Sequence, residues 1–215
     1  MRKILVAIVA LMTSLSAFAA DLDIFLKGGV SISKFNLEES ENRMGFAAGF
    51  GGKFLISDSK FFLMPELMYA QKGQENEVVY DDQITFNPVM YHMIELPVLF
   101  GAQFDMPVKE MKLGFGVGPY ISYDYRFTEE NNHMMYVKTP SKMRSFSRGD
   151  LGVAFSLEFH YKRLFVFGDY DLGLRDITQN TLGIDDKINH RSMRFGAGYT
   201  FPTMTIGKGR RKPQL

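Results

Sequence analysis

The chain has 215 residues, with 25 lysines and arginines against 24 aspartates and glutamates, so its formal net charge is only +1. A nucleic-acid-binding protein is normally distinctly basic, and this balance argues against one. The lack of cysteine excludes disulfide scaffolds, iron–sulfur clusters, thiolate-bound zinc and thiol nucleophiles. A content of 14% aromatic residues with 20 glycines is typical of a β protein. After the first twenty residues, no apolar run is long enough for a membrane-spanning helix.

The first twenty residues have the pattern of an export signal. Arg2 and Lys3 form a basic start, an apolar run covers Ile4 to Met12, and Ala17 to Ala19 supply a small-x-small cleavage site. We therefore expect residues 1–19 to be a signal peptide, and the mature protein to begin after Ala19. No cysteine follows the cleavage site, so the product is not expected to be a lipoprotein.

Alternation of apolar with polar or small residues is the main structural signal in the mature chain. It is strict in the segment DLGVAFSLEFHY, Asp150 to Tyr161, and only a β-strand places alternate residues on one face. Each alternating segment is about 12 residues long, against about 5–6 for strands of soluble proteins and about 9–11 for a tilted strand that crosses a membrane. The eight predicted strands are Leu22–Ser33, Met44–Ile56, Lys60–Lys72, Val89–Gln103, Met111–Tyr123, Asp150–Tyr161, Leu164–Arg175 and His190–Phe201.

The connections between these strands alternate between long and short. Outer-membrane barrels have short periplasmic turns and long extracellular loops. The sequence therefore predicts an all-β fold over residues 20–201, an eight-stranded antiparallel up-and-down transmembrane β-barrel with both termini in the periplasm. The predicted long loops are Lys34–Arg43, Gly73–Pro88, Asp124–Gly149 and Asp176–Asn189, and the predicted turns are Ser57–Ser59, Phe104–Glu110 and Lys162–Arg163.

The two faces of the predicted strands differ in charge. One face carries leucine, valine, isoleucine and phenylalanine and is expected to meet lipid, while the other carries glycines and charged residues. An eight-stranded barrel is only wide enough for side chains to fill it, so we expect ion-pair networks in the lumen, with glycines making room for long charged side chains. The inward face also includes Asp23, Lys27 and Lys53. The expected network residues are Glu66, Glu95, Lys112, Glu158, Asp169, Asp171, Arg175 and Arg194.

Several segments resemble strands of the outer-membrane protein β-barrel domain family, which is also labelled porin-like or PorT-like. The most specific matches are Glu-Leu-Pro at 95–97 and Gly-Pro-Tyr at 118–120, and the similarity covers essentially the whole mature chain. It implies an eight-stranded outer-membrane barrel, in a family without an assigned reaction or ligand. In one respect the chain departs from this pattern, because the matching terminal aromatic, Phe201, is followed by PTMTIGKGRRKPQL. The matching segments are PELMYAQKG, MIELPVLFGAQF, GFGVGPYISY, DLGVAFSLEFHY, FGDYDLGLRDI and NHRSMRFGAGYTF.

Candidate catalytic and metal-binding residues are few. The pair His190-x-Ser192 is similar to the His-x-Ser of eight-stranded lipid A deacylases, in which histidine activates serine. Alternation points Ser192 into the lumen, whereas lipid cleavage needs a lipid-facing group, so we interpret the pair as an ordinary rim pair. His92 and His133 are isolated in the pattern, and His160 lies beside Glu158, so these are interpreted as polar fillers. We predict no catalytic site, cofactor or metal.

The segment Asp124–Gly149 is the longest predicted loop and the best candidate for contact with an external partner or with lipopolysaccharide phosphates. The basic segment 202–215 is interpreted as a solvated periplasmic tail, with anionic lipid as an alternative contact. The cations expected to make the loop contact are Arg126, Lys138, Lys142, Arg144 and Arg148.

We expect a closed structural or surface-interaction barrel in the outer membrane of a Gram-negative bacterium. Its expected partners are outer-membrane lipid and lipopolysaccharide, the barrel-assembly machinery and an unidentified surface or secretion partner, without nucleic acid. Three alternatives stay open: a narrow channel or porin-like transporter, an outer-membrane lipid-modifying enzyme and a soluble periplasmic barrel.

Overall fold

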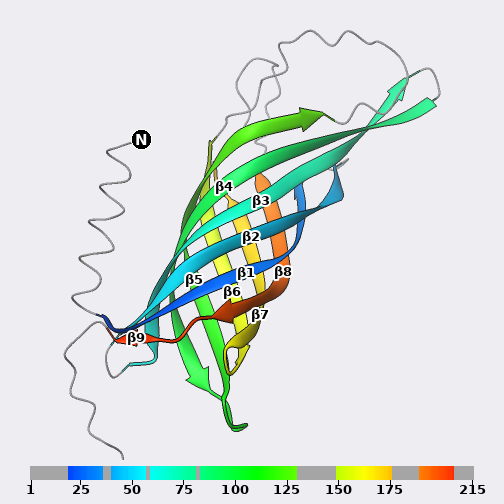
Figure 1. Cartoon of the computed structure of the whole chain (residues 1–215). Coiled ribbons are helices and arrows are strands. Elements are labelled where there is room, and N and C mark those ends of the chain that lie inside the picture. The colour runs from blue at the N-terminus through cyan, green and yellow to red at the C-terminus, as the bar shows by residue number, and fades with distance from the viewer. Residues whose placement is uncertain are drawn as a thin grey trace, which may run out of the picture.

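The computed structural model describes residues 19–35, 40–56, 59–80, 83–129, 149–175 and 189–205. Nearly all of them lie in one antiparallel sheet, in which each long strand pairs with the next and β8 pairs back with β1, closing an eight-stranded barrel (Figure 1). The described part of the chain holds no helix of the length and apolarity needed to cross a membrane. The strands are β1 (Ala19–Phe35), β2 (Ser40–Ile56), β3 (Phe61–Tyr80), β4 (Gln83–Asp105), β5 (Met111–Glu129), β6 (Gly149–Tyr161), β7 (Leu164–Gly173), β8 (His190–Thr200) and the short β9 (Met204–Thr205).

The predicted alternation is present in the barrel wall. Along β6, exposed residues such as Leu151 and Phe155 alternate with buried ones such as Ser156 and Glu158. The outward side chains are apolar, and charged and polar side chains are enclosed on the inward face, which is the reverse of a soluble protein. A surface of this kind is far more apolar than soluble monomers expose and suits contact with lipid tails. The predicted fold class is confirmed.

The strands of the first half of the chain are much longer than predicted. Strands β1 to β5 have 17 to 23 residues, whereas β6, β7 and β8 have 13, 10 and 11. The predicted loop Gly73–Pro88 is wrong, because β3 and β4 stay paired from Gly73 with Met90 to Tyr80 with Gln83. A two-stranded ribbon with water on both faces does not need alternating apolar and polar residues. The alternation in the sequence therefore stops before the backbone pairing of β3 with β4 does. Figure 1 shows this β3–β4 hairpin reaching beyond the other strands.

One end of the barrel carries the short connections 106–110 and 162–163, and we call it the turn end; the opposite end is the loop end. Glu110 and Lys162 have left-handed backbone, with φ of 66° and 57°, which costs roughly 1 kcal/mol for a residue other than glycine. The Lys162 N–H donates to the Glu110 carbonyl at 3.1 Å, and the two side chains form an ion pair at 3.5 Å. The two turns therefore stabilise each other.

The start of the segment 202–215 belongs to the sheet. Met204 and Thr205 form β9, which pairs with Leu22 and Asp21 of β1, and the Thr203 hydroxyl donates to the Asp23 carboxylate at 2.5 Å. The predicted tail thus separates from the sheet later than expected. Residues 206–215 and the predicted signal peptide, apart from Ala19 in β1, lie outside the described residues.

Apolar side chains fill part of the lumen, which the sequence analysis did not anticipate. A Cβ built on Gly51 would come within 2.5 Å of the Phe25 ring, and one on Gly101 within 2.5 Å of the Phe62 ring. These glycines therefore make room for aromatic rings. Gly114, by contrast, lies beside the Glu158 carboxylate, which is the arrangement that was predicted. We call this buried apolar cluster the aromatic layer; it comprises Phe25, Phe62, Met64, Leu99, Tyr120, Ala154, Phe165 and Phe167.

Candidate functional site

Seven charged side chains meet in the middle of the lumen, and none is more than 4% exposed. They project from β1, β3, β4, β7 and β8, because inward positions of these strands fall at the same depth in the closed barrel. We call this group the central network. Its members are Lys27, Glu66, Lys72, Glu95, Asp169, Asp171 and Arg194.

Arg194 contacts the largest number of carboxylates in the central network. Its Nη1 donates to Glu95 Oε2, and its Nη2 donates to Asp171 Oδ1 at 2.8 Å. Its Nε lies 3.6 Å from Asp169 Oδ2. One guanidinium therefore joins β8 to both β4 and β7, as its forked, planar donor set allows.

Lys72 connects opposite walls of the barrel. Its Nζ lies 2.5 Å from Glu95 Oε1 on the neighbouring strand and 3.0 Å from Asp171 Oδ2. Asp171 is on β7 and Lys72 is on β3, four strands away in a ring of eight. This pair therefore crosses the lumen along its diameter.

Lys27 forms the second lysine bridge. Its Nζ lies 2.8 Å from Glu66 on β3 and 2.9 Å from Asp169 on β7, and it sits 4.7 Å above the Phe167 ring. Two serine hydroxyls complete the central network, one of which, Ser156, donates to Asp169 Oδ1 at 2.7 Å. Its three cations face four carboxylates, so the central network carries one surplus negative charge.

A smaller polar group lies nearer the turn end. The Nζ of Lys53 on β2 donates to Glu158 Oε2 at 2.5 Å and to Gln103 Oε1 at 3.3 Å, and lies 3.4 Å from His160 Nε2. Glu158 is on β6, opposite β2, so this contact also spans the lumen. We call these four residues the turn-end cluster.

The aromatic layer lies between the two polar groups. Counted from the turn end, phenylalanine comes before the first central network residue on three strands: Phe25 before Lys27 on β1, Phe62 before Glu66 on β3, and Phe167 before Asp169 on β7. The Lys53 ammonium lies 4.7 Å from the Phe62 ring centroid, and the His160 ring stacks on Phe165 at 4.8 Å. The two polar groups are thus kept apart by apolar side chains.

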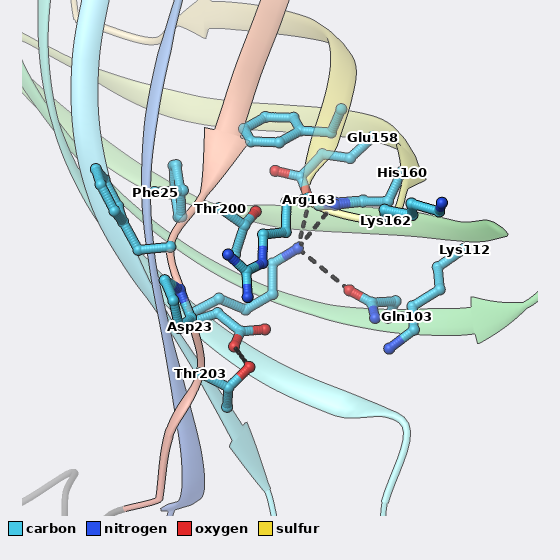
Figure 2. A pocket seen from close by; sticks show the side chains of 14 residues that line it. Asp23, Phe25, Gln103, Lys112, Glu158, His160, Lys162, Arg163, Thr200 and Thr203 are labelled. Atoms are coloured by element: carbon cyan, nitrogen blue, oxygen red, sulfur yellow. Dashed lines mark hydrogen bonds and ion pairs between the residues drawn. The ribbon is translucent and has the colours of Figure 1, made fainter. Parts of the chain in front are cut away.

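A cavity of about 240 Å³ opens beside the turn-end cluster (Figure 2). The turn residues Lys162 and Arg163 line it, together with Lys112 and the segment after β8. Figure 2 shows Glu158, His160 and Gln103 joined by dashed lines to one ammonium group, that of Lys53, and Asp23 hydrogen-bonded to Thr203. The cavity therefore joins buried polar groups to the surface at this end.

Six of the eight predicted network residues are buried in the lumen, where Glu158 belongs to the turn-end cluster and the other five to the central network: Glu66, Glu95, Asp169, Asp171 and Arg194. The predictions for Lys112 and Arg175 are wrong. Lys112 is the second residue of β5 and is exposed at the cavity, and Arg175 lies two residues after the end of β7, exposed and beside Gly149. Alternation alone could not show which inward positions are open to solvent at the ends of the barrel. Lys72 was missed, although it shares a face with Glu66 six residues earlier.

The remaining predicted site residues have different outcomes. Ser192 lies in the lumen, where its hydroxyl donates to Asp171 Oδ2 at 3.0 Å, so it does not face lipid. His92 lies on the outward side of β4, between the buried Tyr91 and Met93; its Nδ1 lies 2.7 Å from Tyr69 Oη, and the Tyr125 ring is adjacent. The side chains of His190, Arg126, Lys138, Lys142, Arg144 and Arg148, and all of His133, lie outside the described residues.

Comparison with known proteins identifies the type of barrel. The family profile described as "Outer membrane protein beta-barrel domain" matches residues 16–179. No curated protein matches the chain significantly.

Solved structures with a similar fold include the attachment invasion locus protein Ail of Yersinia pestis, at 15% identity and a TM-score of 0.40, covering 84% of this chain and 98% of that one. Neisserial surface protein A has 13% identity and a TM-score of 0.47, covering 82% and 95%. Outer Membrane Protein W of Escherichia coli has 14% identity and a TM-score of 0.37, covering 83% and 97%. At these scores, none of them assigns a ligand or partner to this chain.

Proposed function

Because the chain belongs to the outer membrane protein β-barrel domain family, we propose that it is a closed, non-conducting barrel that acts through surface contacts at its loop end. The observation that supports this function is the filled lumen. Lys72 and Asp171, and Lys53 and Glu158, join opposite walls, and the aromatic layer lies between these pairs.

An ion that crossed this lumen would have to separate buried ion pairs. The central pair Lys72–Asp171 is fully enclosed, with both side chains only 1% exposed. Leaving one buried charge without its partner costs about 3–5 kcal/mol. Passage through the unaltered barrel would therefore be rare, and a scaffold or surface-interaction role is favoured over a channel.

The proposed orientation puts the turn end in the periplasm and the loop end outside the cell, as in other outer-membrane barrels. In this orientation the β3–β4 hairpin projects from the cell surface, and it is the described element that reaches farthest. The predicted loop Asp124–Gly149 begins later than expected, because β5 runs to Glu129 and includes Arg126. We propose the cations between β5 and β6, together with Arg126, as contacts for lipopolysaccharide phosphates or an acidic partner; they are Lys138, Lys142, Arg144 and Arg148.

Electrical recording in planar lipid bilayers tests the closed lumen. Wild-type protein is expected to give no steady conductance, whereas Lys72→Ala combined with Arg194→Ala removes two of the cross-lumen cations and is expected to give brief openings. The variant must first show the heat-dependent gel mobility of a folded barrel. Steady conductance of the wild type would favour the alternative function, a narrow channel.

Surface labelling of intact cells provides the second arm of this test. A short tag inserted in the connection between Tyr80 and Gln83, which pair with each other at the end of the β3–β4 hairpin, is expected to be labelled. A matched tag beside Lys109 at the turn end is expected to be labelled only after the cells are broken. Labelling of the Lys109 tag on intact cells would reverse the proposed orientation.

A further inference from the structure

The cavity at the turn end is blind. Phe25 and Phe165 of the aromatic layer form part of its wall and are only 2% and 3% exposed, so the layer closes it toward the centre of the lumen. A molecule in the cavity would therefore have to arrive and leave through the turn end. The arrangement suits binding and not passage.

The cavity wall contains more basic than acidic side chains. Four basic residues line it, Lys53, Lys112, Lys162 and Arg163, against two acidic ones. Both acidic residues already have partners within the wall. Glu158 accepts hydrogen bonds from Lys53 and contacts His160, and Asp23 accepts one from Thr203.

Two of the cations are left to face the cavity. Within the described part of the chain, neither Lys112 nor Arg163 forms an ion pair with a carboxylate, and the Arg163 contact is to the Tyr199 hydroxyl at 3.4 Å. The Lys162 side chain forms an ion pair with the Glu110 carboxylate at 3.5 Å. A cleft of one charge sign with low-dielectric walls focuses its field and concentrates ions of opposite charge.

We propose that this cavity binds the oxyanion head group of a small organic molecule. Lys112 and Arg163 supply the opposing charge at the mouth, and the Gln103 amide and the His160 ring supply polar contacts deeper in the wall. A volume of about 240 Å³ is small compared with typical drug-sized pockets of about 300–1,000 Å³. It therefore suits a single head group, such as a phosphate monoester, better than a polymer segment. In the orientation proposed above, the ligand would come from the periplasm.

Calorimetric titration of the purified full chain in zwitterionic detergent tests this site. The probes are glycerol 3-phosphate, lysophosphatidic acid and uncharged glycerol. We expect one or both phosphate probes to bind and glycerol not to bind. The double variant Lys112→Gln/Arg163→Gln is expected to weaken phosphate binding about tenfold, which is the combined effect of removing two partly exposed charges.

A matched control separates the site from the general charge of the turn end. Lys109→Gln removes an exposed lysine at the same end that does not line the cavity, and it is expected to leave the affinity within about twofold. Binding of lysophosphatidic acid alone would assign the head group to a lipid, and binding of glycerol 3-phosphate would assign it to a soluble molecule. Binding of neither, or equal loss in the double variant and the control, would overturn the proposal. Neither outcome depends on whether the barrel conducts.

Discussion

The central network and the turn-end cluster both contain an ion pair that spans the lumen, but the two pairs lie in different environments. In both, a lysine spans the lumen to a carboxylate on the opposite wall, Lys72 to Asp171 and Lys53 to Glu158. The central network is enclosed on all sides, whereas the turn-end cluster borders a cavity that opens to solvent. The comparison shows that the free-energy cost of breaking a buried ion pair is larger where water cannot enter. Water can take the place of a lost partner only where it reaches the remaining charge.

The largest effect is expected from Arg194→Ala. Removal of the guanidinium leaves Glu95 and Asp171 with less compensation in an enclosed lumen, so the free energy of unfolding is expected to fall by about 3–5 kcal/mol. Urea unfolding of the barrel in lipid vesicles, followed by gel mobility, measures it. Arg191→Ala alters an exposed residue of the same strand and serves as the control. Equal midpoints for the two variants would show that the central network is solvated.

A smaller effect is expected from Lys53→Ala. Glu158 loses its closest cation but keeps His160 at 3.0 Å and gains access to water from the cavity. We expect the free energy of unfolding to fall by about 1–2 kcal/mol, close to the cost of one unsatisfied polar group. The same unfolding measurement applies. A loss as large as that of Arg194→Ala would mean that water does not enter the cavity, and the contrast between the two regions would disappear.

The smallest effect is expected from Glu66→Gln. This change removes one negative charge from a network in which four carboxylates face three cations, and Lys27 keeps its contact with Asp169. The amide has nearly the shape of the carboxylate, so the free energy of unfolding is expected to change by less than about 1 kcal/mol. Glu95→Gln, which weakens contacts with both Lys72 and Arg194, is the comparison and should cost more. Equal losses would show that the surplus charge has no effect on stability.

Prediction from sequence succeeded for properties that a single strand determines, such as the face on which a side chain lies. Alternation correctly put Glu158, Asp169 and Arg194 on inward faces, because successive side chains of a strand point to opposite sides. It failed at the strand ends, where Lys112 and Arg175 keep the inward parity but are exposed to solvent. Lys112 is still paired with Asp105 and His160 at the cavity, whereas Arg175 lies past the last residue of β7. It also missed the extension of β3 and β4, since a ladder of backbone hydrogen bonds needs no particular pattern of side chains outside the lipid layer.

The sequence by itself determined the type of fold and the side of the wall on which most residues lie, because both depend on local periodicity and on the lengths of strands and connections. Only the tertiary structure decided which charges meet. Lys72 reaches Asp171, 99 residues later, because closure and strand stagger bring β3 and β7 to the same depth on opposite walls. The same closure places the phenylalanine rings over glycines of neighbouring strands and leaves a cavity at the turn end. These contacts depend on the distance across the lumen, which no single strand encodes.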